Sequence, residues 1–170
     1  MDKIKKFIDC AVPIHNCNLK CDYCFISTMK DGTKERKTKK IPWSPETIRK
    51  GLSKERWGGT LVLNFCGAGE TLLSNEILPI VKELCDEGHY CMIVTNGTIT
   101  PKFKEITTWP IELRKHLFIK FSYHFLELKR LKLTEIFFEN IRRMKESGVS
   151  FTVEVTPSDE YIPYIKEIKE

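Results

Sequence analysis

The sequence lacks any long hydrophobic run. Nowhere in its 170 residues is there a stretch of about 18 apolar residues, which a membrane-spanning helix would need. The N-terminal segment also lacks an apolar stretch of signal-peptide length. Both absences predict a cytoplasmic protein that does not enter a membrane. Apolar residues are otherwise plentiful, because 41% of the chain is hydrophobic and 11% aromatic. This composition excludes a disordered chain and predicts one globular domain over residues 1–170.

The chain carries little excess of positive over negative charge, except in one stretch. The net charge is only +5, and residues 30–40, "KDGTKERKTKK", hold six basic and two acidic side chains. This stretch has no aromatic residue, so it lacks the mixture of basic and aromatic side chains that binds nucleic acid by stacking. A nucleic-acid partner is therefore not expected. The prediction is a solvated loop, and the alternative is a basic flap over an acidic substrate or partner.

Cysteines that could pair into a disulfide framework are lacking as well. The chain has seven, an odd number, and a reducing compartment makes them poor disulfide candidates. Cys10, Cys85 and Cys91 fall in predicted strands or in a predicted helix, so we expect small core residues there. Cys66 is also expected to be packed, with a thiol that faces a cavity as the alternative.

Strands and helices alternate along the sequence. Short apolar runs rich in β-formers predict strands, and signals such as Ser44 before Pro45, and Gly88 and Gly148, start or end the helices between them. This order predicts an α/β fold with parallel strands, either a doubly wound sheet or a partial (β/α) barrel of about five to six strands. The chain ends in a helix after the fifth strand, which indicates an incomplete barrel or a chain truncated at its C-terminus. Strands are predicted near residues 5–13, 60–65, 90–97, 116–124 and 149–156, and longer helices near 44–55, 75–88, 131–148 and 158–170.

Three cysteines stand together in "HNCNLKCDYCF", where Cys17, Cys21 and Cys24 are spaced C-x3-C-x2-C. A structural zinc site normally has four ligands, but the chain has no second C-x2-C pair, and His15 is the nearest other candidate. The alternative is an iron–sulfur cluster, whose normal ligands are cysteine thiolates. Three thiolates on a four-iron cluster leave one iron without a protein ligand. An open position of this kind generally marks catalysis rather than structure.

The cysteine segment resembles a known signature. "CNLKCDYC" is similar to the C-x3-C-x-aromatic-C motif of the radical S-adenosylmethionine (radical SAM) superfamily, with Tyr23 at the aromatic position. "FCGAGETLL" after the second predicted strand resembles the family's Gly-Gly-Glu segment. "TNGT" after the third resembles a recurrent turn, and "FSYH" after the fourth has Ser122 where many members carry a polar cofactor contact. The resemblance runs in order through essentially the whole chain. It implies a [4Fe-4S] cluster on Cys17, Cys21 and Cys24, and S-adenosylmethionine as the second cofactor.

The Gly-rich segment has a physical rationale beside the resemblance. Gly67, Ala68 and Gly69 are small, so the backbone can approach a ligand closely. The resemblance implies that Glu70 receives the methionyl ammonium group of S-adenosylmethionine. The segment departs from the family pattern, which often reads Gly-Gly-Glu-Pro, because Ala68 adds a residue and Thr71 replaces the proline. The alternative is an ordinary Gly-rich turn from strand to helix.

Strand alternation identifies further candidates at the strand ends. Lys120 and Ser122 share one face of the fourth predicted strand, and Thr152, Glu154 and Thr156 share one face of the fifth, while the apolar residues of both strands are expected beneath the helices. Lys120 and Glu154 are therefore expected as inward neighbours. They form either a buried ion pair that fixes the register or a pair that contacts the cofactor's ribose or carboxylate.

The expected cofactor contacts outside the cysteine segment come from four predicted strand ends. They are Gly67, Ala68, Gly69, Glu70, Asn96, Ser122 and Glu154, with Tyr23 added from the signature. His124 is the one catalytic candidate, because a histidine at a strand end can donate a proton to a substrate.

The resemblance implies reductive cleavage of S-adenosylmethionine to a 5′-deoxyadenosyl radical that abstracts hydrogen from a substrate. That substrate is expected to be a peptide, a small metabolite or another biosynthetic intermediate. A glycyl-radical activase that acts on a partner protein is the alternative within the family. An iron–sulfur protein that only binds or transfers electrons is the alternative outside it, although such a protein would not need "GAGE". A one-electron donor such as flavodoxin or ferredoxin is expected, and so is sensitivity to oxygen.

Overall fold

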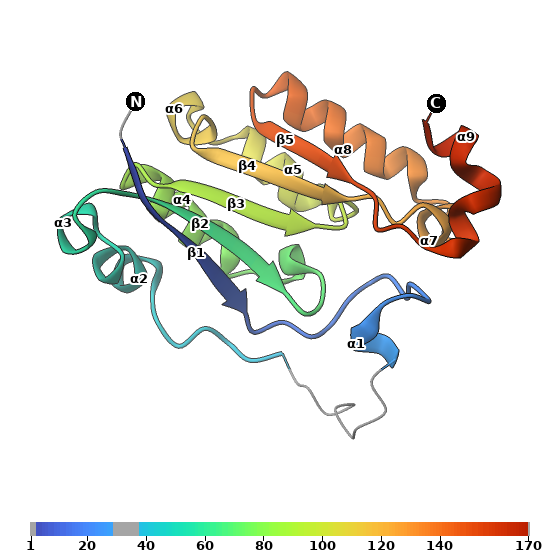
Figure 1. The fold of residues 1–170 in the computed structure, drawn as a ribbon. Coiled ribbons are helices and arrows are strands. Elements are labelled where there is room, and N and C mark those ends of the chain that lie inside the picture. The colour runs from blue at the N-terminus through green and yellow to red at the C-terminus, as the bar shows by residue number, and fades with distance from the viewer. Residues whose placement is uncertain (1–2, 29–37, 170) are drawn as a thin grey trace.

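Five parallel strands form one open sheet in the order β1-β2-β3-β4-β5. The computed structural model describes residues 3–28 and 38–169, so residues 30–37 of the basic stretch lie outside the described part of the chain. The predicted partial barrel is confirmed: the sheet is curved but not closed, with β1 and β5 at its edges (Figure 1). The strands are β1 (Ile4–Val12), β2 (Thr60–Gly67), β3 (Tyr90–Thr95), β4 (Leu117–Ser122) and β5 (Ser150–Glu154).

Helices cover one face of this sheet. Figure 1 shows α4, α5 and α8 behind the strands, whereas the opposite face is not covered by any helix of the described residues. The strands all point the same way, so their carboxyl ends meet at one edge, next to the loop that carries the three cysteines. The helices are α1 (Phe25–Thr28), α2 (Pro45–Gly51), α3 (Lys54–Trp57), η2 (Thr71–Leu73), α4 (Ile77–Asp86), α5 (Thr100–Thr107), α6 (Ile111–Arg114), α7 (Phe125–Arg130), α8 (Thr134–Glu146), η3 (Asp159–Tyr164) and α9 (Ile165–Lys169).

Several helices differ from their predicted extents for local reasons. The helix expected over residues 44–55 is two helices, because α2 ends at Gly51 and Ser53 caps the new helix α3. The C-terminal helix begins instead as the 3-10 segment η3, in which Pro163 removes a backbone donor. Helix α7 was missed, and the region after β3, for which no longer helix is predicted, holds two helices, α5 and α6.

The core lies between the sheet and its helices. In β4, Leu117, Ile119 and Phe121 are buried beneath the helices, as the alternation predicts. The same prediction is wrong for Val153 of β5, which is 43% exposed, and for Val155 just after the strand, which is 38% exposed. Because β5 is the edge strand, it has a neighbour on one side only.

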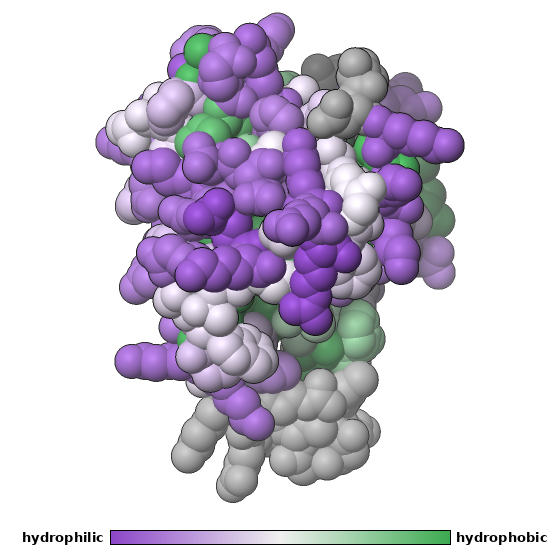
Figure 2. Space-filling model, turned by 90° about the vertical axis from the view of Figure 1, so that its left-hand side faces the viewer, coloured by the Kyte–Doolittle hydropathy of each residue, from purple (hydrophilic) through white to green (hydrophobic). Residues whose placement is uncertain are grey.

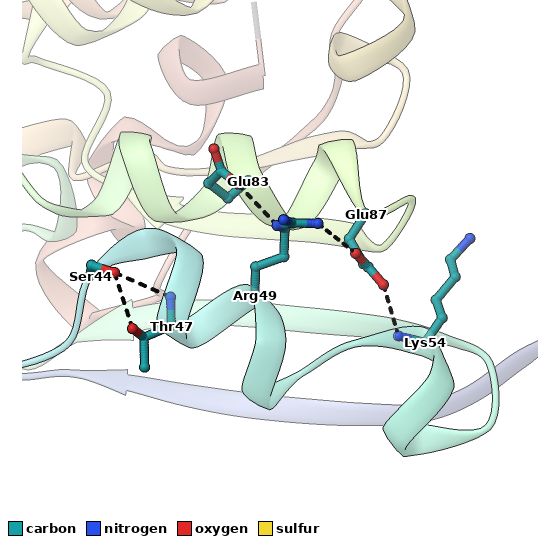
Figure 3. Close-up of polar contacts among 6 residues, drawn as sticks. All are labelled: Ser44, Thr47, Arg49, Lys54, Glu83 and Glu87. Carbon is teal, nitrogen blue, oxygen red and sulfur yellow. Dashed lines mark hydrogen bonds and ion pairs between the residues drawn. The ribbon is translucent and has the colours of Figure 1, made fainter.

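Polar contacts fix α2 and α3 against α4 (Figure 3). The Arg49 guanidinium lies 3.1 Å from a carboxylate oxygen of Glu83 and 3.2 Å from one of Glu87. Glu87 also accepts a 3.0 Å hydrogen bond from the backbone N–H of Lys54 at the start of α3. At the other end of α2, the Ser44 hydroxyl accepts from the backbone N–H of Thr47, so the predicted N-cap is confirmed.

The surface at the amino ends of the strands is mainly hydrophilic, as Figure 2 shows for the side of the molecule that carries α3. Of the helices in residues 3–28 and 38–169, none is long and apolar enough to cross a membrane.

His89 generates a prediction about stability and pH. It is fully buried, its Nδ1 accepts from the backbone N–H of Leu61, and its Nε2 lies 2.7 Å from the carbonyl oxygen of Leu52. Both bonds require a neutral ring with its proton on Nε2, and burial lowers the pKa of His89 below its usual 6.5. The unfolded chain therefore binds a proton that the folded chain excludes. The contribution of His89 to the free energy of unfolding should be fully present above about pH 6.5 and should decrease as the pH falls below that value.

Urea unfolding at neutral pH and at about pH 5.5 measures this dependence. We expect a lower midpoint at the acidic pH, and a flatter pH dependence in His89→Gln, which has no group that titrates there. Equal pH dependence in the two proteins would contradict the assignment.

Candidate functional site

A cavity of about 690 Å³ opens at the carboxyl ends of the strands. Its wall is formed by the loop after β1, the residues around the end of β2, the ends of β3 and β4, and Thr156 after β5. This volume falls in the range of small-molecule sites, and its position is where parallel α/β folds bind ligands. The cavity brings together segments from the ends of all five strands, as the sequence predicts.

The thiols of Cys17, Cys21 and Cys24 all line this cavity. Cys17 is exposed, Cys24 is half-buried and Cys21 is buried on the loop between β1 and α1. Burial raises the pKa of Cys17 and raises that of Cys21 to about 11, so both are thiols until a metal displaces their protons.

The donor set fits an iron–sulfur cluster, because cysteine thiolates are the normal ligands of such clusters. The Cys17 sulfur also faces two donors, the backbone N–H of Leu19 at 3.4 Å and the side-chain amide of Asn96 at 3.8 Å. Hydrogen bonds of this type stabilise a metal-bound thiolate.

The cysteine loop is packed directly on the Gly-rich segment that follows β2. The backbone N–H of Gly69 donates to the carbonyl oxygen of Ile14, and that of Glu70 donates to Asn16, both at 2.9 Å. A Cβ on Gly69 would overlap the Asn16 carbonyl and lie 2.8 Å from the carbonyl carbon of His15, and one on Gly67 would overlap the Ile14 side chain. We expected these glycines to let a ligand approach the backbone closely. The structure shows that they also let the cysteine loop pack closely against it.

Glu70 is the polar centre of this region. It is buried, and one carboxylate oxygen accepts from the Leu72 N–H at 2.9 Å and from the Thr95 hydroxyl at 2.6 Å. The other oxygen accepts from the Asn96 N–H at 2.7 Å. Burial raises the pKa of Glu70, while the bonds from Asn96, Thr95 and Leu72 oppose that rise. Glu70 therefore joins the ends of β2 and β3, a role that the motif alone does not reveal.

The Asn96-Gly97 turn holds the other side of the cysteine loop. The Asn96 side-chain amide donates to Asn18 at 2.8 Å, and the Asn18 amide donates to the Thr98 hydroxyl at 2.8 Å. Gly97 has φ of +75° and packs between Phe121 and Phe137, so both its backbone and its surroundings require glycine. Asn18 and Thr98 were missed, although they lie inside "CNLKCDYC" and "TNGT", because the resemblance assigns no contact to these two positions.

Tyr23, His124 and Tyr161 form a hydrogen-bonded chain at the cavity. The Tyr23 hydroxyl lies 2.5 Å from Nδ1 of His124, and the Tyr161 hydroxyl donates to Tyr23 at 3.2 Å. Burial lowers the pKa of His124 and raises that of Tyr23, so both are neutral at pH 7. The Tyr23 hydroxyl and Nδ1 of the neutral ring therefore share one hydrogen bond, whose direction depends on the imidazole tautomer. Tyr161 was missed, because it lies in a segment predicted as an ordinary helix.

The remaining candidates lie on β4, on β5 and at the end of β2. Ser122 lines the cavity and is paired in register with Glu154. The Glu154 carboxylate lies 2.8 Å from Lys120 Nζ, which confirms the predicted neighbours. Of the two alternatives for this pair, the buried ion pair is wrong, since the Glu154 and Lys120 side chains are 50% and 33% exposed. Cys66 is exposed and lines the cavity instead of being packed, because it lies on the open face of the sheet.

An open parallel sheet with three thiols and a Gly-rich turn around one cavity defines an α/β cofactor-binding protein. The family model of the Radical SAM superfamily matches residues 11–159, so the chain belongs to this superfamily. Its members use a [4Fe-4S] cluster and S-adenosylmethionine. The search of curated proteins found no match to the chain.

Solved structures share the fold. One, described as "Native anSMEcpe with bound AdoMet", is 16% identical with a TM-score of 0.62, covering 96% of this chain and 47% of the other. A second, described as "Native anSMEcpe with bound AdoMet and Cp18Cys peptide", is 15% identical with the same TM-score and covers 96% of this chain and 46% of the other. The chain therefore spans about half the length of these structures.

Gly69→Ala tests the packing of the cysteine loop. The new methyl group would overlap backbone atoms of Asn16 and His15, which cannot rotate away. We expect a loss of about 1–3 kcal/mol in the free energy of unfolding, the usual cost of overpacking. Urea unfolding of the apo-protein measures it.

Gly51→Ala is the matched control for this substitution. A Cβ at Gly51, the last residue of α2, meets nothing within 4 Å, so alanine introduces no overlap there. The control should be unchanged or slightly more stable, and an equal loss in both variants would contradict the packing argument.

Proposed function

We propose that this chain is the catalytic core of a radical SAM enzyme acting on a peptide or another biosynthetic intermediate. The observation that carries the proposal is the convergence of three cysteine thiols, the "GAGE" turn, Ser122 and His124 on one cavity. When bound, the cluster and S-adenosylmethionine supply reductive cleavage to a 5′-deoxyadenosyl radical, which takes a hydrogen atom from the substrate.

Cys17, Cys21 and Cys24 hold three irons of the cluster and leave the fourth without a protein ligand. His15 is on the same loop and lines the same cavity, and we assign it no ligand role. Three thiolates without a fourth ligand are the arrangement of a catalytic metal site, in which the open position receives a small molecule. The N–H groups of Leu19 and Asn96 stabilise the negative sulfur of Cys17.

The turn after β2 and the ends of β3, β4 and β5 bind S-adenosylmethionine in this proposal. Carboxylate and carbonyl oxygens suit its ammonium group, and hydroxyl groups suit its ribose and carboxylate. The two Glu70 oxygens already accept three hydrogen bonds of about four that a carboxylate can take, so Glu70 retains little capacity and acts mainly by shaping the turn. The residues assigned to this cofactor are Tyr23, Gly67, Ala68, Gly69, Glu70, Asn96, Ser122 and Glu154.

The substrate reaches the same cavity from the open face of the sheet. A peptide is favoured because a solved structure with the same fold is described with a bound peptide. His124 presents a neutral imidazole, so it can form a hydrogen bond to a polar group of the substrate or accept a proton from it. The electron that starts the reaction comes from a one-electron donor such as flavodoxin or ferredoxin.

Replacement of the cysteines tests the proposal. Anaerobic reconstitution with iron and sulfide should give the wild-type protein a visible absorbance of a four-iron cluster. Adding S-adenosylmethionine and a reductant should then yield 5′-deoxyadenosine. Cys17→Ala, Cys21→Ala and Cys24→Ala should each lose both the cluster and the product, because two thiolates do not hold the cube.

Cys10→Ala is the control, since Cys10 is a half-buried residue of β1 outside the cavity wall. It should keep the cluster and the product. A wild-type protein that holds a reducible four-iron cluster but forms no 5′-deoxyadenosine would refute the enzymatic proposal and favour an electron-transfer protein.

A further inference from the structure

We propose that Glu127, oriented by Arg130, is a positioning residue for the cysteine loop and keeps its ligands in the geometry that retains the cluster. The inference rests on the proposed function only in one respect, namely that the three cysteines of this loop bind the cluster. It concerns helix α7, which follows β4 and contributes no cysteine and no part of the "GAGE" turn.

Glu127 lies in α7 and reaches a segment 107 residues away in the sequence. Its side chain is only 7% exposed, which is unusual for a carboxylate. The Oε1 atom accepts a 2.8 Å hydrogen bond from the backbone N–H of Lys20. Lys20 stands between Cys17 and Cys21, so this bond holds the middle of the ligand loop.

Arg130 fixes the orientation of that carboxylate. Its Nε donates to Oε2 of Glu127, and its terminal nitrogen donates to Oε1, both at 2.8 Å. This is the bidentate geometry in which a guanidinium holds a carboxylate most firmly. The Arg130 bonds also lower the pKa of Glu127, so its bond to Lys20 is charge-assisted.

The loop needs such a contact because it has little structure of its own. Residues 13–24 form neither helix nor strand, and α1 starts only at Phe25. The Asn96 turn and the Gly-rich segment hold the part of the loop up to Asn18. Glu127 holds the next part at Lys20, and it does so from a helix, which positions a group more rigidly than a loop does.

The rate at which an iron chelator removes the reconstituted cluster tests the proposal. Cluster absorbance is followed under anaerobic conditions, and electron paramagnetic resonance of the reduced cluster reports its surroundings. Glu127→Ala should release iron about 10-fold faster than wild type or more, as expected when a partner of a metal ligand loop is lost. Glu127→Gln should retain iron better than Glu127→Ala, because its amide oxygen can accept the same N–H, although its NH2 group cannot accept from Arg130.

Glu167→Gln is the matched control. Glu167 is also a carboxylate paired with a basic residue of α7, because both of its oxygens accept from Lys129, the residue next to Arg130. Its side chain is half exposed, and these bonds do not reach the cysteine loop. This control should release iron at the wild-type rate. Circular dichroism and urea unfolding of each apo-variant separate weaker cluster binding from a less stable fold.

Arg130→Ala provides a second test that does not endanger folding, because the Arg130 side chain is 60% exposed. It should release iron several-fold faster than wild type, since the Glu127 carboxylate loses its fixed orientation. Wild-type rates in both Glu127→Ala and Arg130→Ala would overturn the proposal. So would a Glu127→Gln variant as labile as Glu127→Ala, since that would indicate charge rather than the N–H bond.

These outcomes are distinct from failure of the proposed function. A wild-type protein that takes up a cluster without cleaving S-adenosylmethionine refutes the enzyme and leaves the role of Glu127 measurable. A wild-type protein that takes up no cluster overturns both.

Discussion

The buried carboxylate of Glu70 is the interaction on which the site depends. An ionised group out of contact with water is costly unless donors surround it, and here donors from Leu72, Thr95 and Asn96 do so. Because two of these donors belong to the end of β3, the same bonds bring that end against the turn after β2. Asn96 is then placed to hold Asn18 and to face the sulfur of Cys17.

The position of the cysteine loop depends on this arrangement. Its backbone lies against Gly69 at a distance that no side chain allows, and it is held by hydrogen bonds from Gly69 and Glu70. Together with the bond from Lys20 to Glu127, these contacts order a loop that has no helix or strand between Val12 and Phe25. A loop ordered before the metal arrives pays less conformational entropy when it binds, which favours tight and specific ligation.

Because the sheet is open, the side chains on its uncovered face are exposed to solvent. Helices cover one face, and the other carries Cys66, Lys120 and Glu154 with side chains that are partly or largely exposed. A closed barrel would bury these groups, and a paired but buried Lys120–Glu154 would then have to offset a larger desolvation cost. On the open face the pair is partly exposed to solvent, so this cost is smaller.

The sequence by itself determined the α/β order, the parallel sheet and the three thiols, because these depend on local signals: alternation of apolar residues, glycine and proline at turns, and cysteine spacing. It also identified the strand-end residues, since the carboxyl ends of parallel strands must meet at one edge. Only the tertiary structure decided that Gly69 accommodates the cysteine loop, that Tyr161 reaches Tyr23, and that Glu127 holds Lys20. It also decided that Val153 and the Lys120–Glu154 pair are exposed. These features depend on contacts between segments far apart in the chain and on which strand lies at the edge, and no local pattern of residues encodes either.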